Sequence, residues 1–149
     1  MKSNQNNHKI SLIIAAAGLG TRFSSEKPKQ YFKIDNQTIL EKTLSIFRNI
    51  SEIKKIIIPL HKNDKEFKQL DLPDDLNIVT VTGGETRAES VIQALKLINE
   101  DDYVIVHDAV RPFIDESDIH FLIEQFENQN EDCLAVSYTH LTLPTIFRV

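Results

Sequence analysis

Short, nearly unbroken apolar runs rich in β-branched residues recur along this chain, separated by stretches that include helical spacing. The runs lie at residues 10–16 (ISLIIAA), 55–59 (KIIIP), 77–82 (NIVTVT) and 103–107 (YVIVH). Runs of this length and composition are typical of strands that are covered on both faces, as in parallel sheets. Their alternation with helices predicts an α/β fold of three layers with a mostly parallel sheet.

Two of the predicted helices begin with a capping box, in which a threonine and a glutamate three residues later satisfy the first backbone N–H groups. The boxes are TILE at residues 38–41 and TRAE at residues 86–89. The apolar residues that follow at helical spacing are Leu40, Leu44 and Phe47 in the first helix and Val91, Leu95 and Ile98 in the second.

A third helix is indicated by an apolar stripe after residue 117, with Asp115 or Ser117 as its cap. The stripe consists of Ile119, Leu122, Ile123 and Phe126. Residues 65–70 have a weaker helical pattern. We therefore expect three clear helices and one weak one between the strands.

Charge and composition limit the classes of function. A formal net charge of −5 argues against general binding to nucleic acid or to anionic membranes, so an anion site must be a local concentration of charge. Cys133 is the single cysteine, which fits a reducing compartment. The polar residues 1–9 (MKSNQNNHK) predict a disordered start without a signal peptide, and no run reaches the roughly 20 apolar residues of a membrane span. We expect a cytoplasmic protein.

Residues 18–37 form a polar loop that is long for a compact α/β domain, and loops of that length are usually functional or disordered. The loop begins at the carboxyl end of the first strand, the edge at which α/β sheets bind ligands. It opens with Gly18 and Gly20, but Phe23 stands where either a dinucleotide fingerprint or a Walker A loop requires glycine.

The residues around these glycines indicate a phosphate-binding site. Three alanines at residues 15–17 leave the backbone open, and exposed amides there can donate to phosphate oxygens. Arg22 offers a planar fork and Lys29 a point charge. The alternative from the residues alone is that both are solvated loop charges.

Four motifs occur in order: AAGLGTR at residues 16–22, PKQY at 28–31, GGETRAESV at 83–91 and VHDAVRP at 106–112. Together they resemble the 2-C-methyl-D-erythritol 4-phosphate cytidylyltransferases, over residues 10–135. The resemblance implies a Rossmann-like nucleotidyltransferase fold and transfer of a cytidylyl group from CTP to a polyol phosphate. It also implies a homodimer.

The same resemblance assigns Arg22 and Lys29 as catalytic. The residues implied to bind the nucleotide are Ala16, Ala17, Gly18, Gly20, Gly84, Glu85, Ser90, Asp108 and Ala109. From the residues alone, the glycines at 83–84 could be a plain helix entry and Asp108 a turn cap. The resemblance favours Asp108 as a Mg²⁺ ligand. We expect Arg87 and Arg111 to support the edge around the cytosine, and His107, at the end of a strand, to be a structural residue.

The implied chemistry needs no general base, because a phosphate monoester is already mostly ionised near neutral pH, its second pKa being about 6. Catalysis then consists of positioning and of neutralising charge on the α-phosphorus.

Residues 136–149 (VSYTHLTLPTIFRV) do not continue the family pattern. Read back into codons, they match a transposon end and adapter used in sequencing-library preparation. We therefore expect residues 10–135 to be a partial CTP-binding domain and 136–149 a non-native tail. The sheet would end early with an unpaired edge, and the chain by itself would be inactive.

Two other functions remain open. A pentitol-5-phosphate cytidylyltransferase has a similar nucleotide half, and the acceptor half would distinguish it. The chain could also be a nucleotide-binding module without catalysis.

Overall fold

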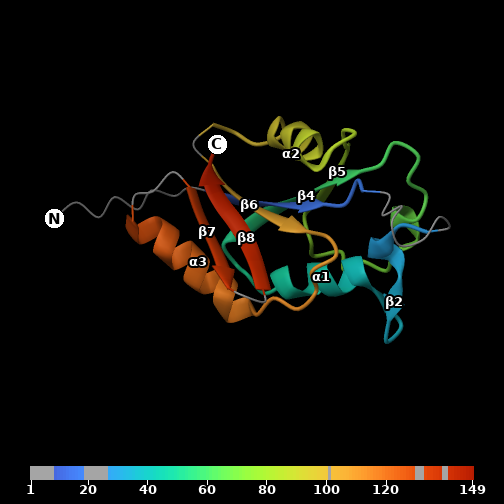
Figure 1. Ribbon diagram of the computed structural model, residues 1–149, viewed down its shortest axis with the longest axis horizontal. Helices are drawn as coiled ribbons and strands as arrows, with labels where there is room; N and C mark the ends of the chain where they lie inside the picture. Colours follow the sequence, from blue (N-terminus) through green and yellow to red (C-terminus); the bar gives the residue numbers. More distant parts are fainter. Residues whose placement is uncertain (1–8, 19–26, 101, 130–132, 139–140) are drawn as a thin grey trace.

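A central sheet organises the chain, for which a computed structural model describes residues 9–18, 27–100, 102–129, 133–138 and 141–149, with the backbone alone at 129, 133–138 and 141–144. Within these ranges the sheet has six strands in the order β5-β4-β1-β6-β8-β7 (Figure 1). The strands are β1 (Ile10–Ala15), β4 (Ile53–Leu60), β5 (Ile78–Thr82), β6 (Tyr103–Asp108), β7 (Cys133–Tyr138) and β8 (Leu141–Arg148). The β4–β5, β1–β4 and β1–β6 pairs are parallel, which confirms the four predicted strands and the mostly parallel sheet.

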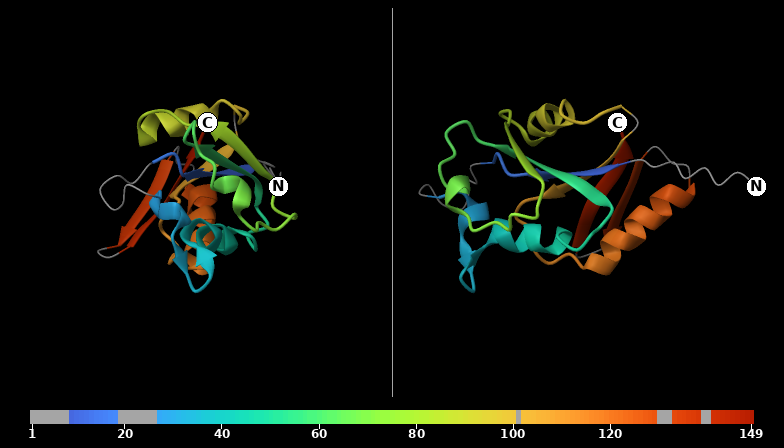
Figure 2. Two further views of the ribbon diagram at one scale, coloured as in Figure 1. Left: turned by 90° about the vertical axis from the view of Figure 1, so that its right-hand side faces the viewer. Right: turned by 180° about the vertical axis from the view of Figure 1, so that it is seen from behind.

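Helices cover both faces of the sheet. The helices α1 (Ile39–Phe47) and α3 (Glu116–Gln129) lie on one face and α2 (Arg87–Leu95) on the other, as Figures 1 and 2 show. Both predicted capping boxes are present, at the starts of α1 and α2. The third helix begins at Glu116, so Asp115 rather than Ser117 precedes it. The three-layer architecture is confirmed.

The alternation of side chains along the strands divides the core in two. Leu12 and Ile14 of β1 pack into the cluster that includes α1 and α3, whereas Ile13 between them joins the cluster beneath α2. All three side chains are fully buried. The strands are therefore covered on both faces, as their continuous apolar runs predicted. None of the helices in the described ranges has the length and apolar character needed to cross a membrane.

Two local predictions were wrong. Residues 65–70 form no α-helix but a short 3-10 turn, η2 (Phe67–Gln69). None of the three residues of this turn is buried, so the segment lacks the buried face that stabilises a helix. The stretch 18–37 is also more structured than a polar loop. Its described part contains a 3-10 turn, η1 (Lys29–Tyr31), and the start of a hairpin formed by β2 (Lys33–Ile34) and β3 (Gln37–Thr38).

The prediction that the sheet ends early with an unpaired edge is also wrong. Strand β8 pairs antiparallel with β6 on one side and with β7 on the other. The register places Phe147 opposite Val104 and Ile146 opposite Ile105, so that Ile146 is fully buried in the α1–α3 core. Alternation with period two lets this segment add to both cores as a strand. The origin of residues 136–149 stays a prediction.

Candidate functional site

A cavity of about 360 Å³ opens at the carboxyl ends of β1 and β6, where Ala15 lies opposite Asp108 in the parallel register. Its wall comes from residues 15–18, from the η1 turn, from residues 84–90 before and within α2, and from residues 108–110. Every predicted site residue within the described ranges lines it: Ala16, Ala17, Gly18, Lys29, Gly84, Glu85, Ser90, Asp108 and Ala109. Arg22 and Gly20 lie outside the described residues.

The glycine pair between β5 and α2 allows this wall to approach the end of β1. A Cβ atom on Gly83 would lie 2.5 Å from the Cβ of Ala17 and 2.8 Å from the Oγ of Ser90, so only glycine fits there. The buried Ser90 hydroxyl accepts from the backbone N–H of Gly84 at 3.1 Å and donates to the carbonyl of Thr86 at 2.9 Å. Ser90 thus holds the shape of the turn that borders the cavity.

Asp108 is held between two arginines from different elements. Arg87, the first residue of α2, donates its Nε–H to Oδ1 at 2.8 Å, and Arg111 donates its Nε–H to Oδ2 at 2.8 Å. Burial raises the pKa of the Asp108 carboxyl, but the hydrogen bonds and charges of Arg111 and Arg87 outweigh it and lower the pKa below its ordinary value. Asp108 is therefore a carboxylate at neutral pH, and Arg87 joins the two walls of the cavity through it.

The turn after β6 is fixed by two buried side chains that donate to its carbonyl groups. The hydroxyl of Thr43, on α1, lies 3.0 Å from the carbonyl oxygen of Ala109. The Nε2 of His107 lies 3.0 Å from the carbonyl oxygen of Arg111, so this nitrogen carries the hydrogen. Burial lowers the pKa of His107, which keeps the ring neutral, and its ring packs edge-on against Phe47. His107 therefore has a structural role, in which it donates a hydrogen bond to the backbone of the turn.

Sequence reasoning did not identify Thr43 or Gln30. Gln30 is buried on η1 and donates its Nε2–H to the carbonyl oxygen of Ala16 at 2.7 Å, which ties the Lys29 turn to the end of β1. No local pattern could indicate these contacts, because each joins a common polar residue to a backbone carbonyl that is distant in the sequence.

The donor set fits a metal ion that is shared with a ligand. No group of three or more His, Cys, Asp or Glu residues is placed to hold a metal within the described part of the chain. Among the described residues, each Asp108 oxygen accepts one hydrogen bond from an arginine, which leaves a further lone pair on each oxygen. Mg²⁺ commonly takes one or two carboxylates and completes its shell with phosphates and water, so a single carboxylate is sufficient here.

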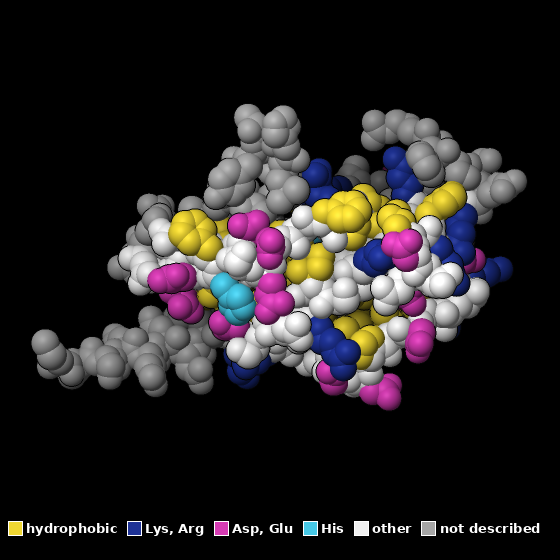
Figure 3. Space-filling view, turned by 90° about the horizontal axis from the view of Figure 1, so that it is seen from below, with side chains coloured by type: hydrophobic (Ala, Val, Ile, Leu, Met, Phe, Trp, Pro, Cys, Tyr) yellow, Lys and Arg dark blue, Asp and Glu magenta, His cyan; other side chains and the backbone are white. Residues whose placement is uncertain are grey.

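Charge is unevenly distributed over the surface. On the face that carries α1 and α3, the α3 half carries mainly acidic side chains, whereas lysines and arginines are interspersed with acidic side chains toward the β2–β3 hairpin (Figure 3). The hairpin lies beyond the carboxyl ends of the strands, on the side where the cavity opens (Figure 1). Among the described residues that line the cavity itself, Lys29 and Arg87 are the basic side chains and Glu85 and Asp108 the acidic ones.

The family model and the curated relatives name one family. The model of the 2-C-methyl-D-erythritol 4-phosphate cytidylyltransferase family matches residues 10–143, somewhat beyond the expected limit at residue 135. The enzyme of that name from Actinobacillus pleuropneumoniae serotype 5b is 44% identical over 121 residues, which is 81% of this chain and 53% of that protein. The one from Haemophilus ducreyi is 43% identical over 129 residues, 87% of this chain and 57% of that protein. The chain spans about half the length of the curated relatives it matches.

Solved structures agree with the sequence comparison. The crystal structure of the Francisella tularensis 2-C-methyl-D-erythritol 4-phosphate cytidylyltransferase matches with a TM-score of 0.72 and 30% identity, over 94% of this chain and 72% of that one. Mycobacterium tuberculosis Rv0371c in complex with manganese shares the fold, with a TM-score of 0.72 at 18% identity, over 94% of this chain and 71% of that one. With its four motifs, its matched residues and its fold, the chain belongs to the 2-C-methyl-D-erythritol 4-phosphate cytidylyltransferase family.

Proposed function

We propose that this chain forms the CTP-binding part of an enzyme that transfers the cytidylyl group of CTP to 2-C-methyl-D-erythritol 4-phosphate. The products are CDP-methylerythritol and pyrophosphate, in the non-mevalonate route to isoprenoids. The observation that carries the proposal is the single cavity that gathers all the described residues predicted to bind nucleotide, in a chain of this family.

The reaction proposed here is the one that the family's name describes. An oxygen of the acceptor's phosphate attacks the α-phosphorus of CTP, and the bond from that phosphorus to the bridging oxygen of the β-phosphate breaks. Pyrophosphate leaves with the electron pair. Lys29, at the cavity wall, neutralises negative charge that builds up on the phosphates, and Arg22 shares this role in the proposal. The already ionised phosphate nucleophile requires no base.

The cytosine ring lies between the end of β1 and the turn before α2 in this proposal. Ala16 and Ala17 on one side and Gly84 on the other present backbone and small side chains, which leave room for a flat ring. The backbone N–H groups of Gly84 and Glu85 are bonded to Ser90 and Glu89 within the turn. The carbonyl oxygen of Gly84 has only a long contact of 3.4 Å with the Ser90 hydroxyl, so it can accept from the exocyclic amine that distinguishes cytosine from uracil.

A divalent cation completes the proposed site. Asp108 would hold Mg²⁺ together with the nucleotide phosphates, where the metal would neutralise phosphate charge. Support comes from the lone pairs that Asp108 retains and from a related fold that was solved with manganese. Arg87 and Arg111 keep the carboxylate ionised and oriented.

The charge, the cysteine content and the family resemblance support three further proposals. The formal net charge of −5 agrees with a protein that binds no nucleic acid, and the single cysteine agrees with a cytoplasmic location. A homodimer is implied by the family resemblance.

Calorimetric titration of the 149-residue chain tests the proposal. We expect CTP to bind more tightly than UTP and more tightly with Mg²⁺ than without, whereas little CDP-methylerythritol should form, because the relatives are about twice as long. Phosphorus NMR with methylerythritol phosphate or a pentitol 5-phosphate as acceptor identifies any product. A chain that binds CTP and UTP equally, or neither, would refute the nucleotide site, and a pentitol product would establish the alternative enzyme.

A further inference from the structure

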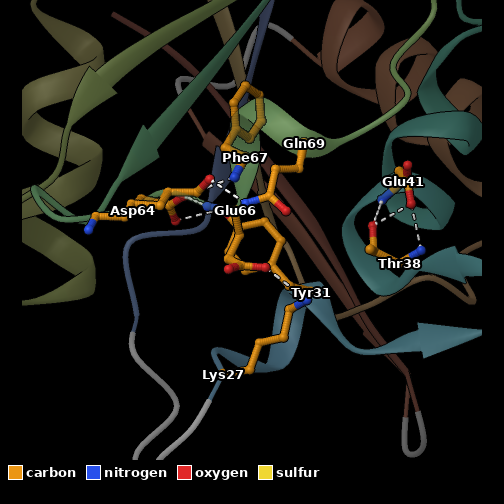
Figure 4. Close-up of polar contacts among 9 residues, drawn as sticks. Lys27, Tyr31, Thr38, Glu41, Asp64, Glu66, Phe67 and Gln69 are labelled. Atoms are coloured by element: carbon orange, nitrogen blue, oxygen red, sulfur yellow. Dashed lines mark hydrogen bonds and ion pairs between the residues drawn. The ribbon is translucent and has the colours of Figure 1, made fainter.

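The turn that carries Lys29 is attached to a segment on a different part of the chain. Tyr31, at the end of η1, is almost fully buried and donates its hydroxyl hydrogen to the Oδ2 of Asp64 at 2.6 Å (Figure 4). A hydrogen bond of that length to a carboxylate is of the strong, charge-assisted kind. Burial and the charge of Asp64 raise the pKa of Tyr31, so the hydroxyl keeps its hydrogen.

Asp64 is itself fixed by the backbone. Its other oxygen, Oδ1, accepts from the N–H groups of Glu66 and Phe67, both at 3.0 Å. Both oxygens of the carboxylate are therefore engaged, one by the segment that follows Asp64 and one by Tyr31, as Figure 4 shows. A side chain held in this way offers Tyr31 an acceptor at a defined position.

The η1 turn is short enough to transmit this constraint to Lys29. The N–H of Tyr31 bonds to the carbonyl of Pro28 at 3.0 Å, and the N–H of Phe32 bonds to the carbonyl of Lys29 at 3.1 Å. The buried Gln30 bonds to the end of β1 between them. The backbone of Lys29 therefore has the Tyr31 anchor two residues away and no freedom to turn independently of it.

We propose that Tyr31 and Asp64 are positioning residues that keep Lys29 directed at the phosphates of the nucleotide. The inference rests on the proposed function, in which Lys29 neutralises phosphate charge. A lysine has a flexible four-carbon stem, so the region its ammonium group can reach depends on where the backbone is held. Holding the turn in advance spares the entropy of ordering it when the nucleotide binds.

A second contact between the same segments gives a matched control. Lys27 and Glu66 form an ion pair at 2.8 Å, but their side chains are 40% and 34% exposed. Exposed ion pairs contribute little because water and salt screen them. Removal of this pair should therefore leave the turn in place.

The test compares ligands with and without phosphates. Tyr31→Phe keeps the buried ring and removes the hydroxyl alone. We expect its affinity for CTP to fall about tenfold, the order for a hydrogen bond to a charged group, with its affinity for cytidine unchanged. In a Lys29→Met background the same substitution should have no further effect, and Lys27→Met should behave as wild type. Equal losses for cytidine and CTP, or an unchanged affinity for CTP, would overturn the proposal.

Hydrogen exchange provides a readout that does not depend on nucleotide. In Tyr31→Phe the backbone amides of residues 31 and 32 should exchange about tenfold faster, whereas amides in β6 should not change. Unchanged exchange at the turn overturns the inference, and equal acceleration throughout the sheet does so as well, because the bond would then serve global stability. A wild-type chain that binds no CTP refutes the proposed function instead, while the exchange data still decide whether Tyr31 holds the turn. Asp64→Ala should reproduce the effect from the other partner.

Discussion

Replacement of Thr43 by valine, compared with replacement by serine, should show whether Thr43 affects CTP affinity separately from the stability of the fold. Thr43 is fully buried on α1, and its hydroxyl lies 2.9 Å from the carbonyl oxygen of Ile39 and 3.0 Å from that of Ala109. The Ile39 carbonyl already accepts the helical N–H of Thr43, so the hydroxyl hydrogen matters most to Ala109, which borders the cavity.

The structure gives the magnitude. Thr43→Val leaves the Ala109 carbonyl without this donor in a buried place, which costs about 1–3 kcal/mol. The added methyl group returns up to about 0.8 kcal/mol of hydrophobic free energy. Threonine and valine have similar helix propensities, so α1 itself is little affected. We expect the free energy of unfolding to fall by about 1–2 kcal/mol.

Thr43→Ser is the matched control, since it keeps the hydroxyl and loses a methyl group worth about 1 kcal/mol. Urea unfolding should therefore show both variants destabilised to a similar extent. Calorimetry with CTP should show that only Thr43→Val loses affinity, by roughly tenfold, because only there does the Ala109 turn lose its support. Equal affinities in the two variants would refute the reasoning, and so would a valine variant as stable as the wild type.

Three further predictions concern the proposed site. Asp108→Asn should abolish most of the Mg²⁺ effect on CTP affinity, and an unchanged metal response in calorimetry would leave Asp108 as a turn residue. Because Arg87 and Arg111 lower the pKa of Asp108 in the folded state, this carboxylate contributes stability above its unfolded pKa of about 4, and the contribution is lost as the pH falls through the lowered value. The difference between wild type and Asp108→Asn in urea unfolding should therefore narrow below about pH 4, and a difference that widens there contradicts this assignment. In a catalytically active, longer form of the protein, Lys29→Ala or Arg22→Ala should lower turnover by about 100-fold or more in a pyrophosphate-release assay, and unchanged turnover in both would remove their catalytic role.

Local sequence signals were sufficient for most elements. The capping boxes at Thr38 and Thr86 are both present, because each joins side chains and backbone within four residues. The apolar stripe of α3 is buried as predicted, since helical spacing alone brings its members to one face. The helix predicted at residues 65–70 is absent, because the same spacing of apolar residues also fits a turn that packs only partly against the core.

The residues of the site also fall into those that the sequence predicted and those that it did not. The residues that line the cavity were found from the four motifs, and the carboxyl ends of parallel strands explain why such distant motifs meet. Their supports were missed, among them Thr43, Gln30 and the Tyr31–Asp64 pair. Each makes its bond to a partner between 14 and 66 residues away, and a polar residue gives no sign in the sequence of which distant group it will reach.

The sequence by itself determined the four parallel strands, the capped helices, the family and the predicted site residues that line the cavity. These features depend on hydrophobic period, on short-range capping and on motifs that are read along the chain. Only the tertiary structure decided that β8 inserts beside β6, that Arg87 and Arg111 hold Asp108 between them, and that Tyr31 anchors the Lys29 turn. The physical reason is that strand pairing and buried hydrogen bonds are chosen among many distant candidates by the packing of the whole core, which no local stretch of sequence contains.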